Sequence, residues 1–203
     1  MPIKLGTTNI ILPYSKAYLG SDLVYQKSGG YVDTEFTECP FPTSWTAVTA
    51  YVKYSAENEY GIWNVEASSA SGRSYPACNA FNGNLADLWH STPIEDDNTA
   101  ETIEISLPAK TFIKPTTIYV RNETQGNLHN KSKVQGYNSE TNLWEDLITL
   151  DRRGDSPTAS TYNVSSSTFY SKFRIECYKH SSTFSAVSIY ELQVRSGMIR
   201  KYT

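Results

Sequence analysis

The chain has little cysteine and methionine, and its charges are nearly balanced. Its three cysteines, Cys39, Cys78 and Cys177, show no Cys-x-x-Cys spacing and no histidine at ligand spacing. This argues against a zinc site or a framework of disulfides and leaves room for one disulfide at most. The 18 lysines and arginines against 21 aspartates and glutamates give a net charge of -3. A charge of this sign and size excludes broad electrostatic attraction to nucleic acid or to anionic lipid.

Long apolar runs are also missing. No stretch approaches the length that spans a membrane, and the start Met1-Pro-Ile-Lys-Leu-Gly6 lacks the basic start followed by an apolar run that marks a signal peptide. The sequence therefore predicts a protein that is made in the cytoplasm, carries no signal peptide and does not insert into a membrane.

Catalytic motifs are absent as well. The chain has no Gly-x-Ser-x-Gly, no His-Glu-x-x-His and no phosphate-binding glycine loop, and its three histidines stand at no nucleophile or metal-ligand spacing. The adjacent acids Glu95, Asp96 and Asp97 are typical of a solvated loop, since paired catalytic carboxylates have to converge across a cleft. We therefore expect a protein that is not an enzyme.

Helical periodicity is almost absent, and short runs of alternating apolar and polar residues take its place. The apolar positions of these runs are Ile103, Ile105 and Leu107; Ile118 and Val120; Phe173, Ile175 and Cys177; and Tyr190, Leu192 and Val194. Pro108 and Pro115 stand where a strand is expected to end. The pattern predicts an all-β fold, an antiparallel sandwich or barrel. The tryptophans expected in its core are Trp63, Trp89 and Trp144.

The N-terminal part of the chain differs from the rest in its sequence pattern. Short β segments are expected at residues 3–10 and 16–25. Such segments cannot bury their own apolar side chains, so they need a partner surface, which is either the sandwich itself or another subunit. We expect residues 1–60 to form a β attachment or oligomerisation segment with a linker, residues 61–197 a β-sandwich, and residues 198–203 a C-terminal tail.

The stretch from Ser69 to Ser91 contains the most distinctive motifs. Its pieces Ala80-Phe-Asn-Gly-Asn84 and Leu88-Trp-His-Ser91 resemble the turn and the tryptophan-containing strand of the discoidin family, also called factor 5/8 type C or galactose-binding-like domains. Further segments resemble the strands of that family in the family's order, up to a closing strand at residues 188–194. The resemblance implies a discoidin-like jelly-roll β-sandwich that serves recognition, as in a carbohydrate-binding module.

The same resemblance implies a structural Ca²⁺ between the turn and the last strand. Asn82 and Glu191 stand at the positions of the family's ligands, but the family has an aspartate where this chain has Asn82. An amide keeps an oxygen ligand and removes a formal charge, so we expect weak binding of the cation. The alternative is that Asn82 only favours the tight turn and that Glu191 pairs locally.

The resemblance also implies a ligand-binding rim on loops at one end of the sandwich. Sugar sites combine an aromatic platform with planar polar groups, because a pyranose ring presents C–H faces and fixed hydroxyls. The leading candidates for ligand contacts are Arg121, His129 and Phe184, with Asn127 and His90 beside them.

A second resemblance concerns the N-terminal segment. The segment Lys16-Ala-Tyr-Leu-Gly-Ser-Asp-Leu-Val-Tyr25 resembles the short β-modules near the N-termini of tailed-phage structural proteins. It implies a non-catalytic virion structural protein of tail, baseplate or head-fibre/decoration type, located in the virion. Its N-terminal segment would contact other virion proteins and form a homo-oligomer, and its sandwich would bind a cell-surface glycan or a neighbouring protein. The alternatives are a purely architectural virion assembly protein without a glycan ligand, and a bacterial carbohydrate-binding module detached from an enzyme.

Overall fold

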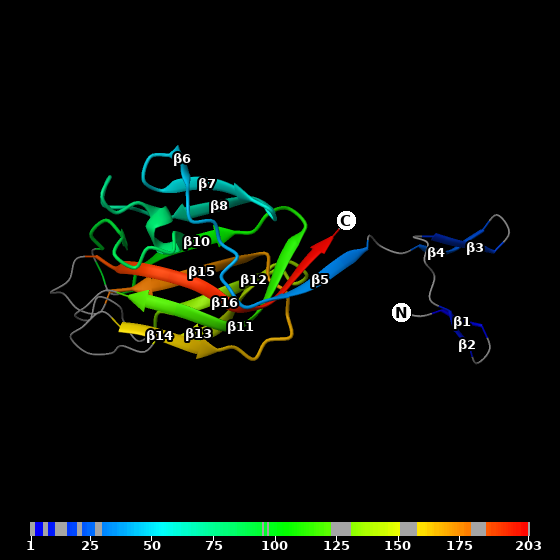
Figure 1. Cartoon of the computed structure of the whole chain (residues 1–203). Helices are drawn as coiled ribbons and strands as arrows, with labels where there is room; N and C mark the ends of the chain where they lie inside the picture. Colours follow the sequence, from blue (N-terminus) through cyan, green and yellow to red (C-terminus); the bar gives the residue numbers. More distant parts are fainter. Residues whose placement is uncertain are drawn as a thin grey trace.

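Two antiparallel β-sheets form the main body of the chain (Figure 1). The computed structural model describes residues 3–5, 8–10, 16–19, 22–26, 30–94, 96, 98–122, 131–150, 158–179 and 186–202, with side chains from residue 30 onward except that of Thr158. Every strand pair within these ranges is antiparallel, so the all-β prediction is confirmed. No helix in this part of the chain is long and apolar enough to cross a membrane.

The first sheet has seven strands, in the order β13 (Leu143–Thr149), β12 (Lys133–Asn138), β15 (Lys172–Tyr178), β10 (Ala100–Ser106), β8 (Gly61–Ala67), β7 (Lys53–Asn58) and β6 (Thr46–Thr49). The second sheet has five strands: β14 (Thr158–Asn163), β11 (Thr111–Asn122), β16 (Ser188–Tyr202) and β5 (Tyr31–Phe36) in that order, with β9 (Trp89–His90) paired to the start of β16. A short 3-10 helix, η1 (Ala77–Phe81), lies between β8 and β9 in the chain.

Side chains from both sheets meet in one apolar core. The alternating residues predicted to face inward are almost all buried, and Ile103, Ile105, Phe173 and Ile175 have no exposed surface. Burying one such side chain stabilises the fold by roughly 1.5–3 kcal/mol. Cys177 belongs to the same core, and all three cysteines are free thiols, so no disulfide joins them.

The tryptophans divide between core and surface. Trp63 and Trp89 are fully buried, as predicted, and their indole N–H groups donate to Asn58 Oδ1 and to the Ser69 carbonyl, each at 2.8 Å. Trp144 differs from the prediction, because its ring is only half-buried on β13. The guanidinium of Arg174 lies 4.2 Å from the ring centroid, so the stacked arginine, not the core, covers this indole.

Strand β11 does not end at Pro115, contrary to the expectation from sequence. The register between β11 and β16 shifts around Pro115 and Thr117, and β14 pairs with β11 only from Thr117 onward, so the missing N–H of the proline interrupts no regular ladder. Opposite it, Gly197 has a φ of +157°, and a Cβ there would lie 2.3 Å from the Lys114 carbonyl oxygen. Only glycine allows the two strands to approach this closely.

Beyond this bulge, three strand segments form a ribbon at one end of the second sheet. They are β5, residues 111–115 of β11 and residues 197–202 of β16. We call them the C-terminal ribbon, since they lie where the chain ends in Figure 1.

Both sheets include residues outside the 61–197 range expected for the sandwich. Strand β5 pairs with β16, β6 and β7 extend the seven-stranded sheet, and β16 continues to Tyr202. Before β5 the chain forms two separate antiparallel pairs, β1 (Ile3–Leu5) with β2 (Thr8–Ile10) and β3 (Lys16–Leu19) with β4 (Asp22–Gln26). These pairs coincide with the short β segments predicted from the sequence.

Candidate ligand-binding rim

His90 lies at the edge of the second sheet, where β9 pairs with β16. The fully buried Trp89 anchors this two-residue strand, so His90 points away from the core and is half-buried. Its Nδ1 lies 2.5 Å from the Ser188 hydroxyl, and its ring centroid lies 5.5 Å from that of Tyr75. Tyr75 is 42% exposed, which leaves an aromatic surface next to a polar pair.

Arg121 lies on the other side of β16, at the end of β11. The register shifts between Arg121, opposite Glu191, and Asn122, opposite Ile189, so Tyr190 is the extra residue of a bulge. The guanidinium of Arg121 lies 4.9 Å from the centroid of the Tyr190 ring. Stacking on an aromatic face orients the guanidinium plane and leaves its edge for hydrogen bonds.

These side chains form one row across three neighbouring strands. Arg121 comes from β11, Tyr190 and Ser188 from β16, His90 from β9, and Tyr75 from the loop before η1. We call this row the rim. It brings together Arg121 and His90, two of the five residues predicted as ligand contacts.

The other three predicted contacts, Asn127, His129 and Phe184, lie outside the described residues.

Sequence reasoning missed Tyr75, Ser188 and Tyr190. The alternation assigned Tyr190 to the core together with Leu192 and Val194, but only these last two are fully buried. The bulge opposite Arg121 breaks the alternation, so Tyr190 does not face the core. No local sequence signal marks that bulge. Tyr75 stands within the Ser69–Ser91 motif, so a search of that motif for exposed aromatic residues would have found it.

The turn after η1 has the tight geometry predicted for Ala80-Phe-Asn-Gly-Asn84. Gly83 has a φ of +75°, and the nearest atom to an added Cβ would be Thr43 Cγ2 at 3.6 Å, so backbone conformation, not space, requires glycine. Asn82 Oδ1 accepts a hydrogen bond from the Asn84 N–H at 2.8 Å, and Asn82 Nδ2 donates to Asp87 Oδ2 at 3.3 Å. The amide of Asn82 thus stabilises the turn.

Glu191 links this turn to β16. Its Oε2 accepts a hydrogen bond from the Gly83 N–H at 3.0 Å, and its buried Oε1 has no partner of good hydrogen-bond geometry among the described atoms, although the side chain of Gln193 lies near enough to lower the pKa of the carboxyl. Burial raises the pKa of the carboxyl to about 8.

The carboxylate of Glu191 fits a hard cation, because an unpaired buried oxygen is a ready ligand. The amide of Asn82 fits less well, since its oxygen is already engaged within the turn. The described part of the chain contains no cluster of three or more metal-binding side chains, so most oxygens around a cation there would have to come from backbone carbonyls or water.

Comparison with protein-family models gives no match, and comparison with curated proteins gives none either. Solved structures do match. The family 32 carbohydrate-binding module of Clostridium perfringens NanJ, solved with galactose, has a TM-score of 0.51 and 18% identity, covering 72% of this chain and 99% of that chain. The C-terminal domain of a chitobiase from Bacteroides fragilis has a TM-score of 0.51 and 20% identity, covering 70% and 97%. Chitosan-binding module 1 from a Paenibacillus chitosanase/glucanase has a TM-score of 0.50 and 15% identity, covering 66% and 92%.

The fold is a discoidin-like β-sandwich. This confirms the fold implied by the Ala80–Asn84 turn and the Leu88–Ser91 strand. The matched structures include carbohydrate-binding modules, and they give no support to the likeness of residues 16–25 to phage structural proteins.

Proposed function

We propose that this chain is a non-catalytic glycan-binding module and that the rim contacts a sugar. The observation that carries the proposal is the row formed by Arg121 on Tyr190 and by His90 between Ser188 and Tyr75. A tyrosine ring packs against the C–H face of a pyranose, and the planar guanidinium donates two parallel hydrogen bonds to neighbouring hydroxyls. The sugars and polysaccharides named for proteins of the same fold support this ligand class.

A glycan array with the purified full chain, run with and without Ca²⁺, tests whether a sugar binds. The best ligand is then titrated by calorimetry into the wild type and the Arg121→Ala variant, for which we expect about a tenfold loss of affinity. Arg174→Ala is the matched control, because Arg174 also stacks on an aromatic ring, 4.2 Å from the Trp144 ring centroid, but stands on β15 in the other sheet. Absence of binding on the array, or equal affinities of the two variants, would overturn the proposal.

We further propose that Glu191 ligates a structural Ca²⁺ together with the turn around Asn82. The cation would supply charge neutralisation to a buried carboxylate that has one unpaired oxygen. The measurement is the thermal unfolding midpoint in Ca²⁺ and in chelator. A rise in Ca²⁺ that disappears in Glu191→Gln supports the site, and identical midpoints for the wild type in both buffers contradict it.

For the wider role of the chain we keep the hypothesis of an attachment segment at the N-terminus, which in a virion protein would contact other virion subunits. The hypothesis rests on the likeness of residues 16–25 and on the two strand pairs before β5. Light scattering of the full chain, compared with a chain that lacks residues 2–29, tests it. A smaller number of subunits in the assembly after the deletion supports attachment, and an unchanged number of subunits excludes oligomerisation through this segment.

A further inference from the structure

A second surface with the chemistry of a sugar site lies at the opposite end of the second sheet, on the C-terminal ribbon. Two hollows adjoin there. The first has a volume of about 290 Å³ and lies between Arg200 and Tyr202 of β16, Phe112 of β11 and the loop segment 167–169. We call it the arginine hollow.

Arg200 is held firmly in place at the wall of this hollow. Its Nε and Nη2 donate to the two carboxylate oxygens of Asp33 at 2.8 and 2.7 Å, which is a bidentate pair. The guanidinium also lies 3.9 Å from the centroid of the Phe169 ring and 4.0 Å from that of Tyr31. A planar donor group fixed between two rings is preorganised, so a ligand need not restrict it further.

Aromatic rings from three strands surround the arginine. The ring centroids of Phe112 and Tyr202 are 5.6 Å apart, and so are those of Tyr202 and Tyr31. Tyr31 is 52% exposed, so this cluster presents a ring surface to solvent. On the opposite wall, Ser139 and Glu140 bring a hydroxyl and a carboxylate. Ring faces with convergent hydrogen-bonding groups are the usual composition of a sugar site.

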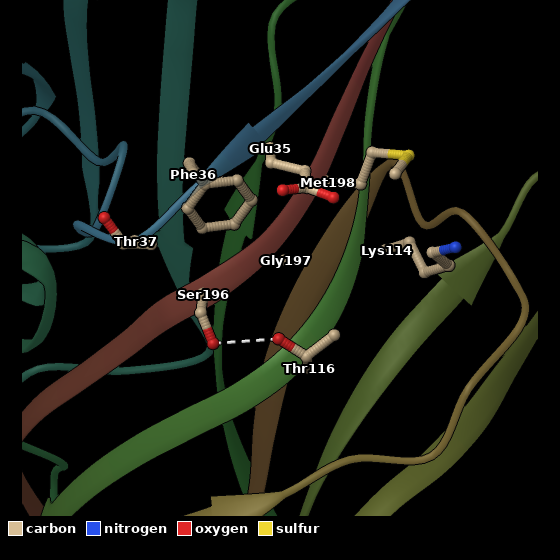
Figure 2. Close-up of a pocket in the computed structure, with 8 residues that line it drawn as sticks. All are labelled: Glu35, Phe36, Thr37, Lys114, Thr116, Ser196, Gly197 and Met198. Atoms are coloured by element: carbon tan, nitrogen blue, oxygen red, sulfur yellow. Dashed lines mark hydrogen bonds between the residues drawn. The ribbon is translucent and has the colours of Figure 1, made fainter.

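The second hollow, of about 360 Å³, is drawn in Figure 2. Lys114 and Met198 line it. These two residues pair between β11 and β16, as Phe112 and Arg200 do two residues away along each strand. Figure 2 shows Glu35 beside Met198. We call it the methionine hollow.

The ring of Phe169 links residues of the two hollows. It lines the arginine hollow, and its centroid lies 3.9 Å from the Arg200 guanidinium and 5.5 Å from the ammonium of Lys114, which lines the methionine hollow. At the far end of the methionine hollow, the Thr116 and Ser196 hydroxyls are hydrogen-bonded at 2.8 Å (Figure 2). Each hollow is near the lower limit of roughly 300–1,000 Å³ for ligand pockets, so each has room for a single ring.

The charged side chains around the two hollows limit which class of ligand they can bind. Asp33 neutralises Arg200, and the lining of the two hollows holds one further cation, Lys114, beside the carboxylates of Glu35 and Glu140. This balance offers no excess of positive charge for a phosphate or a uronic acid. We propose that the C-terminal ribbon is a second glycan-binding surface, which takes two consecutive rings of a neutral oligosaccharide across the arginine and methionine hollows. The proposal stands independently of the rim.

The test is an NMR titration of the ¹⁵N-labelled full chain with lactose, cellotriose and N-acetylchitotriose, each to 10 mM. We expect at least one sugar to shift the backbone amides of Phe112, Ser139, Thr168 and Arg200. If none of the three shifts these amides at 10 mM, the proposal is overturned.

Variants separate this surface from the rim. Ser167→Trp places an indole in the arginine hollow at an exposed position, and Ser165→Trp is its matched control just outside the hollow. We expect Ser167→Trp to weaken binding at the ribbon at least tenfold and Ser165→Trp to leave it unchanged. Phe169→Ala, with its fold checked by circular dichroism, should have the same effect as Ser167→Trp. Equal ribbon shifts in both tryptophan variants would overturn the proposal.

Three further outcomes are distinguishable. If Arg121→Ala abolishes all sugar-induced shifts, the rim is the sole site, and the second surface is excluded while the proposed function stands. If sugar shifts the ribbon amides of the wild type but not its rim amides, the second surface is supported and the assignment of the rim fails. Shifts of the ribbon amides on deleting residues 2–29, without sugar, would show that the chain's own N-terminus covers the ribbon, which also overturns the proposal.

Discussion

The two ends of the second sheet are built by the same two strands, β11 and β16, yet they hold their arginines differently. At the rim, Arg121 rests on one ring at 4.9 Å and has no ion pair among the described residues. On the C-terminal ribbon, Arg200 lies between two rings and is paired with Asp33. At the rim, no carboxylate of the described residues takes up the donors of Arg121. On the ribbon, the pair with Asp33 makes Arg200 more rigid and leaves it the Nη1 hydrogens and one Nη2 hydrogen.

The two ends also differ in what supports them. Glu191, buried and linked to Gly83, underlies the rim, whereas the close approach of Gly197 to β11 shapes the ribbon. Perturbing each support should therefore affect one end first.

The largest effect is expected from the ionisation of Glu191. Its pKa is about 8 in the folded chain against 4.5 as the ordinary value, so between these values the folded state binds more protons than the unfolded state. Stability should fall as the pH rises from about 4.5 to about 8, by up to about 5 kcal/mol in total. Urea unfolding at a series of pH values measures this, and Glu191→Gln should remove most of the slope. An equal slope in the variant would contradict the assignment, and Ca²⁺ should reduce the slope in the wild type.

Gly197→Ala should come next, with a loss of about 3 kcal/mol, because the added Cβ would lie 2.3 Å from the Lys114 carbonyl oxygen and force the two strands apart. Gly72→Ala is the control. Gly72 also has a positive φ, of +130°, but no atom lies within 4 Å of an added Cβ, so only the backbone term of about 1 kcal/mol applies. Denaturant midpoints compare the two, and equal losses would mean that the close approach at the ribbon is not the cause.

A smaller effect is expected at the rim from Tyr190→Ala, which removes the ring beneath Arg121. We expect sugar affinity to fall about tenfold, or about 1.4 kcal/mol, with Tyr190→Phe close to the wild type because the ring face is kept. Calorimetry with the best array ligand measures both variants. If the phenylalanine variant is as weak as the alanine variant, the hydroxyl and not the ring face makes the contact.

The smallest effect is expected from Asp33→Asn, at about 0.5–1 kcal/mol of stability, since the pair with Arg200 is partly exposed. The hydrogen bond from Arg200 lowers the pKa of Asp33, so the contribution is present at neutral pH and is lost as the pH falls below the ordinary value of 3.8. Thermal unfolding at pH 7 and pH 3 should therefore separate wild type and variant less at pH 3 than at pH 7. The same difference at both values would point to packing instead of charge.

Much of the fold was predictable, because the features that determine it are local. The period of two at Ile103 and Ile105 and at Phe173 and Ile175 follows from the geometry of a strand with one buried face. The turn at Gly83 follows from a backbone conformation that glycine adopts readily. The candidate site was predictable only in part, since Arg121 and His90 were named but their aromatic neighbours were not.

The errors share one physical cause, the irregular register between β11 and β16. Pro115 was expected to end a strand, and it lies instead inside β11 at a bulge. Tyr190 was expected in the core, and a second bulge turns it toward Arg121. A bulge depends on how two strands more than 60 residues apart in this chain align, which neither strand's own sequence reveals.

Local sequence patterns were enough to predict the all-β class, the inward-facing residues, the tight turn and two members of the rim, because each depends on neighbours within a few positions. The folded chain was needed to show that residues 31–60 join both sheets and that Tyr75 and Tyr190 complete the rim. It also placed Arg200 between Phe169 and Tyr31. These contacts join residues far apart in the chain, and strand pairing across the sandwich is what brings them within reach of one another.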